Sequence, residues 1–465
     1  MTAARQDWLK LPMLVLAIVL AVTMYGVLTA IGQPHEVAIT AAITMLVGTM
    51  WVTEALPIPI TSLIPFAAFP LAGILTHREA ASALGNHVIV LLMGAFMLSK
   101  ALEKSGVHTR LAFGMLKLTG AHSAKRLVLA FMLTAAILSM WISNSATTLM
   151  LMPIGLALVS HFNQPRLAIV LLLAIAYSAS LGGVGTPIGT PPNIIFISIY
   201  EEFTGIQLGF ADWMQYGIPV VVVAIPLMAL WLTRGIGPLG DVTIPELPAW
   251  RSAERRVLIV FAFIALAWVF RPQWSGMLGV TGIGDSTVAL IGVILMCIIP
   301  TEPRKNSKEK RSYLLDWETA KDIPWGMLLL FAGGICIASA FTQSGLSKLI
   351  GQGLGGLAGL PTLLLVLLLC LAVSFLTEIT SNTATATLLM PILASAALAS
   401  NMDPALLMIP AAISASCAFM LPVATAPNAI VYGTGKIDIK TMAREGAVLN
   451  VMVAVVAALV IGVQF

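Results

Sequence analysis

The chain has 465 residues, of which 58% are hydrophobic and only 10% are charged, and its formal net charge is +4. A soluble domain carries about 25% charged residues, so this composition excludes an ordinary soluble protein and predicts an all-α polytopic membrane protein. Most lysines and arginines fall in a few loops, so the positive charge informs membrane topology and gives no reason to expect a nucleic-acid partner.

Apolar segments of about 20 residues predict the membrane spans. The first follows a short polar start and lacks a clear cleavage site, so it is interpreted as a retained span and not as a signal peptide. The clear candidates in chain order are 11–31, 36–53, 57–75, 87–103, 213–234, 256–272, 279–300 and 443–464.

Two further regions, 125–203 and 323–432, are apolar but interrupted by clusters of Pro, Gly, Asn and Thr. Broken helices are tolerated at membrane depth only where protein or a water-filled cavity covers the freed backbone. These two regions are therefore predicted to contain the functional site of the protein.

Basic residues predict the orientation. The most polar stretch, 301–325, is expected on the cytoplasmic side because it is rich in Lys and Arg. Its basic residues are Arg304, Lys305, Lys308, Lys310, Arg311 and Lys321. An odd number of spans, with the N-terminus inside and the C-terminus outside, fits this distribution.

The broken regions resemble each other. SMWISNSATTLMLMPI at 139–154 matches FLTEITSNTATATLLMPI at 375–392, and two further pairs of segments match in the same order with offsets of 235–239 residues. The predicted organisation is a leading helix (1–35), a first repeat (36–234), a connecting segment (235–275) and a second repeat (276–465). Inverted repeats are typical of transporters with substrate near the midplane. A duplication kept only for packing does not explain why the best matches are the most polar and helix-breaking segments.

Each repeat contains a polar triplet, Ser143-Asn144-Ser145 or Ser381-Asn382-Thr383, that precedes an apolar helical segment. At such a tip the unpaired N–H groups and the positive end of the helix dipole favour a carboxylate. Hydroxyl, amide and main-chain oxygens at the same tip suit a small cation such as sodium. Thr147, Thr148, Thr385 and Thr387 are expected to pack helices together.

A Pro-containing loop follows in each half, GTPPN at 189–193 and ATAPN at 424–428, and exposes main-chain carbonyls. Asn193 and Asn428 are expected to cap the helices that resume. Each half then contributes one tip and one broken loop, and two facing half-sites suit an elongated substrate with an anionic group at each end.

Neither triplet has a Lys or Arg within or beside it, so co-bound cations, or exchange of one anion for another, would compensate a bound dianion. Glu54 and Glu378 are candidate intramembrane carboxylates for ion or proton coupling. Alternatively, Glu54 lies at the membrane interface and Glu378 holds the hairpin by hydrogen bonds. Asp285, in GIGDST, resembles a helix cap.

An intramembrane enzyme is a rival interpretation. It would need a nucleophile–base pair or a metal constellation, but no histidine lies in either triplet or either Pro-containing loop, and Ser143 has no His or Lys near it in the sequence. The sequence therefore predicts a transporter and not an enzyme. A passive anion channel is a second rival, which saturable, gradient-driven accumulation would exclude.

The paired triplets, CAFMLPVATAPNAIVYGTG at 417–435 and WVTEALPIPIT at 51–61 resemble the divalent-anion:sodium symporter family (DASS, or INDY). The resemblance covers nearly the whole chain. It implies a homodimer in the inner membrane, with eleven spans and two re-entrant hairpins per protomer divided into a scaffold domain and a mobile transport domain of the elevator type. The implied substrates are C4 dicarboxylates such as succinate, fumarate and malate, moved with sodium. Some members are exchangers, some carry citrate and a branch carries sulfate.

Carried over by motif, the resemblance also implies site residues. One sodium ion would be bound by Ser139, Ser143, Asn144 and the carbonyl of Gly189, and a second by Thr377, Thr380, Asn382 and Ala424. The substrate carboxylates would meet Asn144, Ser145, Asn382, Thr383 and Thr425. The chain departs from the family pattern at Ser145, where Thr is commoner, and at Ala426, where Pro is usual.

Overall fold

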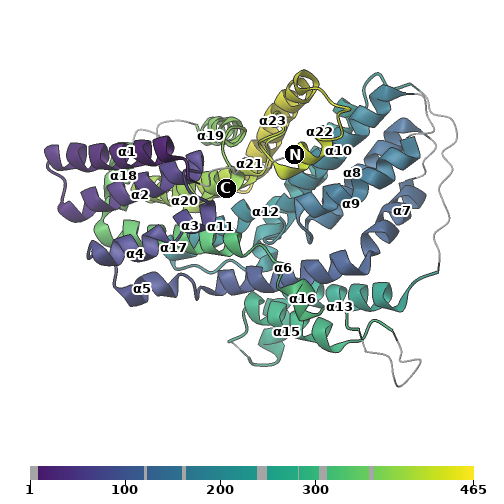
Figure 1. Ribbon diagram of the computed structural model, residues 1–465, viewed down its shortest axis with the longest axis horizontal. Coiled ribbons are helices and arrows are strands. Elements are labelled where there is room, and N and C mark those ends of the chain that lie inside the picture. Colours follow the sequence, from purple (N-terminus) through teal and green to yellow (C-terminus); the bar gives the residue numbers. More distant parts are fainter. Residues whose placement is uncertain are drawn as a thin grey trace.

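The computed structural model describes residues 9–119, 123–159, 164–237, 249–280, 282–302, 312–354 and 361–465. Within these ranges the secondary structure is helical, without any strand longer than the isolated bridge between Pro300 and Tyr313 (Figure 1). Eight of the described helices are long and apolar enough to cross a bilayer. The protein is therefore a multi-pass membrane protein, as its composition predicts.

The helices follow one another in two similar successions. The chain begins with α1 (Leu11–Ala30), α2 (His35–Thr53), α3 (Ile58–Thr61), α4 (Ile64–Leu71), α5 (His77–Ser82), α6 (His87–Ser105) and α7 (Val107–Thr119). It continues with α8 (Ala124–Ser139), α9 (Asn144–Val159), α10 (Pro165–Gly182), the 3-10 turn η1 (Gly183–Gly185), α11 (Pro191–Thr204) and α12 (Phe210–Leu232).

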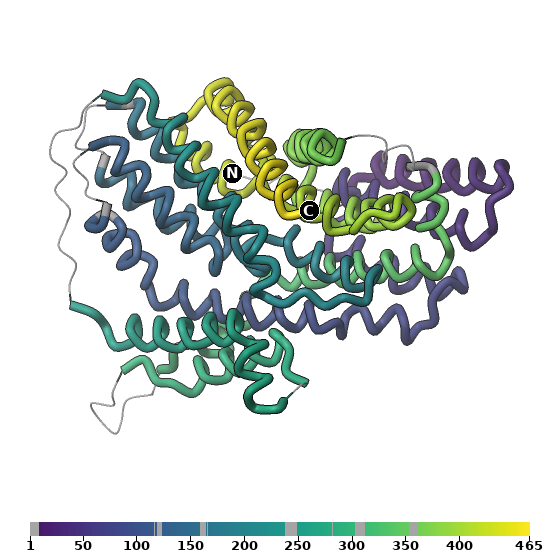
Figure 2. The backbone as a smooth tube through the Cα atoms, turned by 180° about the vertical axis from the view of Figure 1, so that it is seen from behind, coloured from purple at the N-terminus to yellow at the C-terminus, as the bar shows by residue number. Residues whose placement is uncertain are grey.

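The second succession begins with α13 (Ser252–Val269), α14 (Arg271–Met277), α15 (Asp285–Ile298), α16 (Trp317–Ala320), α17 (Trp325–Ser344) and α18 (Leu346–Leu354). It ends with α19 (Thr362–Thr377), α20 (Asn382–Ala399), α21 (Pro404–Ala415), α22 (Ala426–Tyr432) and α23 (Ile439–Gly462). Helices α12 and α23, the last of each succession, lie side by side (Figure 2).

Most predicted spans are confirmed, but three differ from the expectation. The span expected at 57–75 is interrupted, because α3 ends at Thr61 and α4 begins at Ile64 with a proline in its first turn. The span expected at 256–272 bends by 80° where α13 gives way to α14. The span expected at 279–300 contains only the 14 residues of α15. The extended backbone of Gly284 precedes the helix, and the extended backbone of Ile299 ends it.

Two helical hairpins contain the polar triplets. Helices α8 and α9 are joined at the first triplet, and α19 and α20 at the second. A helix of 16 residues, such as α8, is about 24 Å long, whereas the hydrocarbon core is about 30 Å thick. Since α19 also has 16 residues, one arm of each hairpin is shorter than that core, and each tip is suited to end inside the membrane.

The last long helix before each hairpin, α6 in the first succession and α17 in the second, ends in the same way. Gly106 after α6 and Gly345 after α17 have φ values of 76° and 80°, a left-handed conformation that glycine adopts without strain. Near these ends, Lys104 reaches Asp316 before α16, and Gln343 donates to Glu79 of α5. The hydrogen bonds from Lys104 and, to a smaller extent, from Thr319 lower the pKa of Asp316 to about 2. Each of the two helices thus contacts the short helix that precedes the other.

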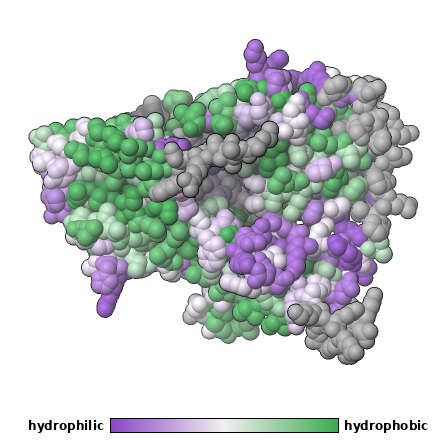
Figure 3. All heavy atoms as spheres, viewed as in Figure 1, coloured by the Kyte–Doolittle hydropathy of each residue, from purple (hydrophilic) through white to green (hydrophobic). Residues whose placement is uncertain are grey.

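The distribution of apolar and hydrophilic side chains on the surface is that of a membrane protein. Apolar side chains cover much of the face shown in Figure 3, particularly around α1 and α2, whereas hydrophilic residues gather around α16. Only 17% of the apolar window of α1 is buried within the protein, compared with 89% for α10. The first helix is thus suited to contact lipid, and α10 lies in the interior beside the first hairpin.

Candidate functional site

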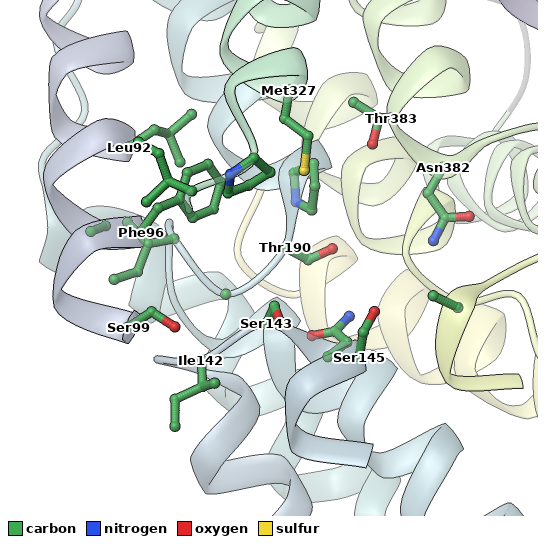
Figure 4. A pocket seen from close by; sticks show the side chains of 18 of the residues that line it. Leu92, Phe96, Ser99, Ile142, Ser143, Ser145, Thr190, Met327, Asn382 and Thr383 are labelled. Atoms are coloured by element: carbon green, nitrogen blue, oxygen red, sulfur yellow. The ribbon is translucent and has the colours of Figure 1, made fainter. Parts of the chain in front are cut away.

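Both triplets face one cavity of about 510 Å³ (Figure 4). Ser143, Ser145, Asn382 and Thr383 lie on its two tips, and Thr190 comes from the first broken loop. The wall facing them is formed by α6, α17 and the segment before α17. The residues of this wall are Leu92, Ala95, Phe96, Ser99, Lys100, Glu103, Asp322, Ile323, Pro324 and Met327. The structure therefore brings together segments of the chain more than 300 residues apart.

The first tip has a cluster of oxygen atoms around Asn144. The hydroxyl of Ser139 donates to Oδ1 of Asn144 over 2.5 Å, and the same amide atom lies 3.2 Å from the carbonyl oxygen of Ala179 and 3.3 Å from that of Gly189. If the amide is turned over, its nitrogen donates to these oxygens instead. The three oxygen atoms of Ser139, Ala179 and Gly189 converge on this amide atom, and such a cluster suits either an amide N–H donor or, with the amide oxygen as a fourth ligand, a small cation.

Two glycines make the close packing at the first tip possible. A Cβ atom on Gly183 would lie 2.9 Å from Oδ1 of Asn144 and 2.8 Å from the carbonyl oxygen of Gly189. A Cβ atom on Gly189 would lie 2.4 Å from the carbonyl oxygen of Gly183. Since real Cβ atoms essentially never approach so closely, any side chain at Gly183 or Gly189 would displace the oxygen cluster.

The second tip repeats the hydroxyl–amide pair. The hydroxyl of Thr377 lies 2.7 Å from Oδ1 of Asn382 and 3.1 Å from the carbonyl oxygen of Ala415. Ala424 lines the cavity beside this tip. Thr380 lies outside the cavity lining, because its hydroxyl bonds the carbonyl of Leu376 and the hydroxyl of Thr385. The first and second tips thus share a buried hydroxyl five residues before an asparagine.

The asparagines of the broken loops do not cap helices, so that expectation is wrong. Nδ2 of Asn193 donates to the carbonyls of Gly183 and Thr186, ten and seven residues earlier. Nδ2 of Asn428 donates to the carbonyls of Ala418 and Leu421, at the same two spacings. Each side chain binds the loop before its helix. Asn193 and Asn428 are the third residues of α11 and α22, and from this position the side chain faces back toward the preceding loop. The cap of α22 is Thr425, whose hydroxyl accepts from the backbone N–H of Asn428.

The other residues predicted for the site line the cavity, and one of them also caps a helix. Ser143 is exposed, lines the cavity and accepts from the backbone N–H of Ala146, so it caps α9. Ser145 is half-buried and Thr383 buried, and both line the cavity in the first turn of their helices. Ala426 is exposed at the second broken loop and also lines the cavity.

Glu378 is buried beside the second tip and holds several segments together. Its Oε1 accepts from the backbone N–H groups of Phe419 and Met420 at 2.7 and 2.9 Å and from Nδ2 of Asn450 at 2.7 Å. Its Oε2 accepts from the N–H of Leu421 at 3.0 Å. All four groups are donors, so the carboxylate form satisfies them best. The hydrogen-bonding alternative expected for Glu378 is therefore the one that the structure supports.

The other two acidic residues are placed differently. Glu54 has a side chain that is 62% exposed, lies at the left-handed end of α2 and pairs with Lys10 at 3.8 Å, which excludes a buried coupling role for it in this structure. Asp285 begins α15, but its carboxylate accepts from the N–H of Phe210 at the start of α12, so the expected cap belongs to another helix.

Sequence reasoning missed several parts of the site. The carbonyl of Ala179, the amide of Asn450 and the whole wall on α6 and α17 have no local sequence signature, because their roles depend on which segments pack together. The one signal that the sequence offers for α6 and α17 is that they precede the triplets in both halves. In the part of the chain that the structure describes, the cavity lining contains one basic residue, Lys100, and two acidic residues, Glu103 and Asp322. Lys100 pairs with Glu103 at 2.9 Å.

Two hydroxyl–amide tips that face one cavity within a bundle of apolar helices are the arrangement typical of a membrane transporter. Residues 48–406 match the family described as CitMHS, citrate transporter. The chain belongs to this family, and the protein is a transporter and not an enzyme. This membership confirms the resemblance to the divalent-anion:sodium symporters that the paired triplets indicate.

Curated relatives support the same family. The sodium-dependent dicarboxylate transporter SdcS of Staphylococcus saprophyticus is 40% identical over 447 residues, which cover 90% of this chain and 84% of the relative. The SdcS protein of Staphylococcus aureus strain RF122 is 40% identical over 451 residues, which cover 92% of this chain and 86% of the relative. The solved structure of the Alcanivorax borkumensis YdaH transporter has a TM-score of 0.60 at 14% identity. That match covers 93% of this chain and 99% of the YdaH chain and shows the fold.

Proposed function

We propose that the protein is a secondary active transporter that moves dicarboxylates across the membrane together with sodium. The observation that carries this proposal is the pair of matching tips at one cavity, Asn144 with Ser139 and Asn382 with Thr377. The names of the relatives, sodium-dependent dicarboxylate transporters that align over most of their length, support the same substrate and coupling ion.

The sodium ions are proposed to bind where the oxygen atoms converge. Ser139, Asn144 and the carbonyl of Gly189 form the first set, and Thr377 and Asn382 with the backbone near Ala424 form the second. Hydroxyl, amide and carbonyl oxygens suit sodium, and broken helices of transporters commonly supply them. Ser143 and Thr380 contribute less directly than the family pattern implies, because their hydroxyls hold the helix ends.

The substrate carboxylates are proposed to meet the starts of α9 and α20. Asn144 and Ser145 at one tip, and Asn382 and Thr383 at the other, present side-chain donors beside unpaired backbone N–H groups. Thr425 contributes from the second broken loop. C4 dicarboxylates such as succinate, fumarate and malate have an anionic group at each end and suit two facing tips.

The charges of the cavity support co-transport with a cation. Among the described residues, its lining has one basic and two acidic side chains, which together carry a formal charge of −1. A dianion added to this lining would be uncompensated, and helix dipoles supply only partial charges. Two or more sodium ions bound with the substrate would provide the missing positive charge.

The proposed movement is of the elevator type. In this scheme 36–234 and 276–465 are inverted repeats, 1–35 leads and 235–275 connects them. The hairpins, α10–α12 and α21–α23 form the transport domain, and α1–α6 and α13–α17 form the scaffold. We further propose a homodimer in the inner membrane with the N-terminus cytoplasmic and the C-terminus outside.

The test is uptake of labelled succinate by the purified protein in proteoliposomes, with an inward sodium gradient or with choline in its place. Sodium coupling predicts saturable accumulation above equilibrium that the gradient drives and choline does not support. Full uptake in choline that needs only internal dicarboxylate would instead identify an exchanger. Competition by fumarate, malate, citrate and sulfate identifies the preferred anion, and stronger inhibition by sulfate or citrate than by the C4 acids would overturn the proposed substrate.

A further inference from the structure

Four aromatic rings meet beside the first tip. Trp141, two residues before Ser143, is stacked on Phe210 with ring centroids 5.8 Å apart and an angle of 9°. Phe210 is stacked on Trp268 at 4.9 Å and 3°. The edge of Phe261 meets Trp141 at 5.3 Å and 87°. Offset-stacked and edge-to-face arrangements at these distances are the favourable geometries of aromatic pairs.

The four rings, which we call the aromatic cluster, belong to two parts of the protein. Trp141 precedes α9 and Phe210 begins α12, both of which pack with the first hairpin and α10. Phe261 and Trp268 lie on α13, which packs against α15 and α6. In the proposed function the first pair belongs to the transport domain and the second pair to the scaffold.

A polar contact crosses the same boundary. The carboxylate of Asp285, on α15, accepts from the backbone N–H of Phe210 at 3.0 Å, which satisfies an unpaired donor at the start of α12. Arg271 lies 2.5 Å from the other carboxylate oxygen, and Nε1 of Trp268 donates to the carbonyl of Asp285. Asp285 and Trp268 thus hold Phe210 through its backbone and its ring at once.

The second tip lacks an equivalent contact. Ile379 occupies the position that matches Trp141, at the offset of 238 residues that relates Asn144 to Asn382. The side chain of Ile379 is 72% exposed, whereas Phe210 and Trp268 are each only 1% exposed. The contact with α13 therefore belongs to the first tip and is not a general property of the repeat.

We propose that the aromatic cluster is a latch that positions the first tip against α13 and stabilises the conformation described here. This inference rests on the proposed function, in which the transport domain moves relative to the scaffold. That movement must separate Trp141 and Phe210 from Phe261 and Trp268, so the strength of the ring contacts contributes to the distribution of the protein between its conformations.

The test compares Phe261→Leu, on the scaffold side, with Phe210→Leu, on the transport side. Neither residue lines the cavity between the tips. Phe263→Leu is the matched control, because Phe263 lies on the same helix but is 61% exposed. The reporter is Ala426→Cys, which lines that cavity, in a Cys297→Ser background that removes the exposed thiol and leaves three buried ones. A membrane-impermeant maleimide is applied to either side of the membrane without sodium or substrate.

Both latch variants should slow labelling from the side on which Ala426→Cys is accessible in the parent, and speed it from the other side. The expected change is about two- to tenfold, the population shift that one aromatic contact produces. The maximal transport rate should change while KM for substrate stays within about twofold, and Phe263→Leu should match the parent in both assays. If size-exclusion chromatography shows that Phe210→Leu does not fold, Phe261→Leu alone decides.

Unchanged labelling in Phe261→Leu, with the protein folded, would overturn the latch. Because the labelling assay contains neither sodium nor dicarboxylate, its result does not depend on the identity of the substrate or coupling ion. A shift in labelling together with sodium-independent uptake would therefore support the latch while contradicting the proposed coupling.

Discussion

The two tips have the same hydroxyl–amide pair but different surroundings. At the first tip the chain packs through glycine, with Gly183 and Gly189 against the oxygen cluster of Asn144. At the second, the matching positions are Ala418 and Ala424. The polar pair is thus similar at the two tips, whereas the loop residues that pack around it differ.

A second difference concerns one residue beside each tip. Glu378 binds three backbone N–H groups and Asn450, whereas the matching residue in the first half is Met140, whose side chain packs near Gly185. An asparagine holds each broken loop, and the second loop is held in addition by the buried carboxylate of Glu378. The two halves therefore share one pattern of hydrogen bonds at the broken loop but differ in the side chain that packs beside it.

The largest expected effect on uptake comes from removing the asparagine amide that both tips contain. Asn144→Ala and Asn382→Ala should each reduce succinate uptake at least about 100-fold, because each removes an amide from both a proposed cation set and a substrate contact. Uptake is measured in proteoliposomes with a sodium gradient. Asn86→Ala is the control, since its amide only caps α6. Near-normal uptake in both tip variants would remove the site assignment.

The difference between Gly183 at the first tip and Ala418 at the second predicts a large effect on sodium dependence for a substitution at the first tip only. Gly183→Ala should raise the half-saturating sodium concentration at least about tenfold, because its Cβ would displace Asn144 or Gly189. The reciprocal change, Ala418→Gly, adds no atoms and should leave sodium dependence within about threefold. The sodium titration of uptake checks both variants. Equal responses would mean that the backbone difference between the halves has no role in cation binding.

An intermediate effect is expected at Glu378. Glu378→Gln keeps the shape of the side chain but turns an amide nitrogen toward backbone donors, at a cost of about 1–3 kcal/mol in the free energy of unfolding. The thermal midpoint of the detergent-solubilised protein should fall, and the half-saturating sodium concentration should rise. Met140→Leu, the matched change in the first half, should alter both within about twofold. A fully stable and active Glu378→Gln protein would show that the anion is dispensable.

The smallest effect is expected from exchanging the last residues of the triplets. Ser145→Thr adds one methyl group to the cavity and Thr383→Ser removes one, while both hydroxyls remain. Each change should alter KM for succinate by no more than about tenfold, the lower end of the effect of one methylene in a pocket. If the two ends of the substrate are held differently, the ratio of KM values for succinate and citrate should move in opposite directions in the two variants.

Much of the site could be predicted by comparing the chain with itself. The offsets that pair Asn144 with Asn382 and Asn193 with Asn428 correspond to the same hydrogen-bond spacings in the structure. The function of the second pair was not predictable, because an asparagine beside a helix start is commonly a cap. Its actual partners are carbonyls of the preceding loop, and only the path of the backbone brings them within reach.

Asp285 shows the limit of local patterns more clearly. Its sequence neighbourhood resembles a cap for its own helix, yet its carboxylate binds the start of α12, 75 residues earlier in the chain. The carboxylate satisfies whichever unpaired N–H group lies nearest in space. Local sequence determines that such a group needs a partner, but not which partner will be there.

The sequence by itself determined the membrane class, most of the spans, the duplication and the two polar tips, because hydrophobic length and local helix breaks are written in neighbouring residues. The tertiary structure alone decided that α6 and α17 form the wall of the cavity between the tips and that Trp141 stacks on Phe210. Such contacts join residues far apart in the chain, and their free energies depend on packing distances that no local pattern contains.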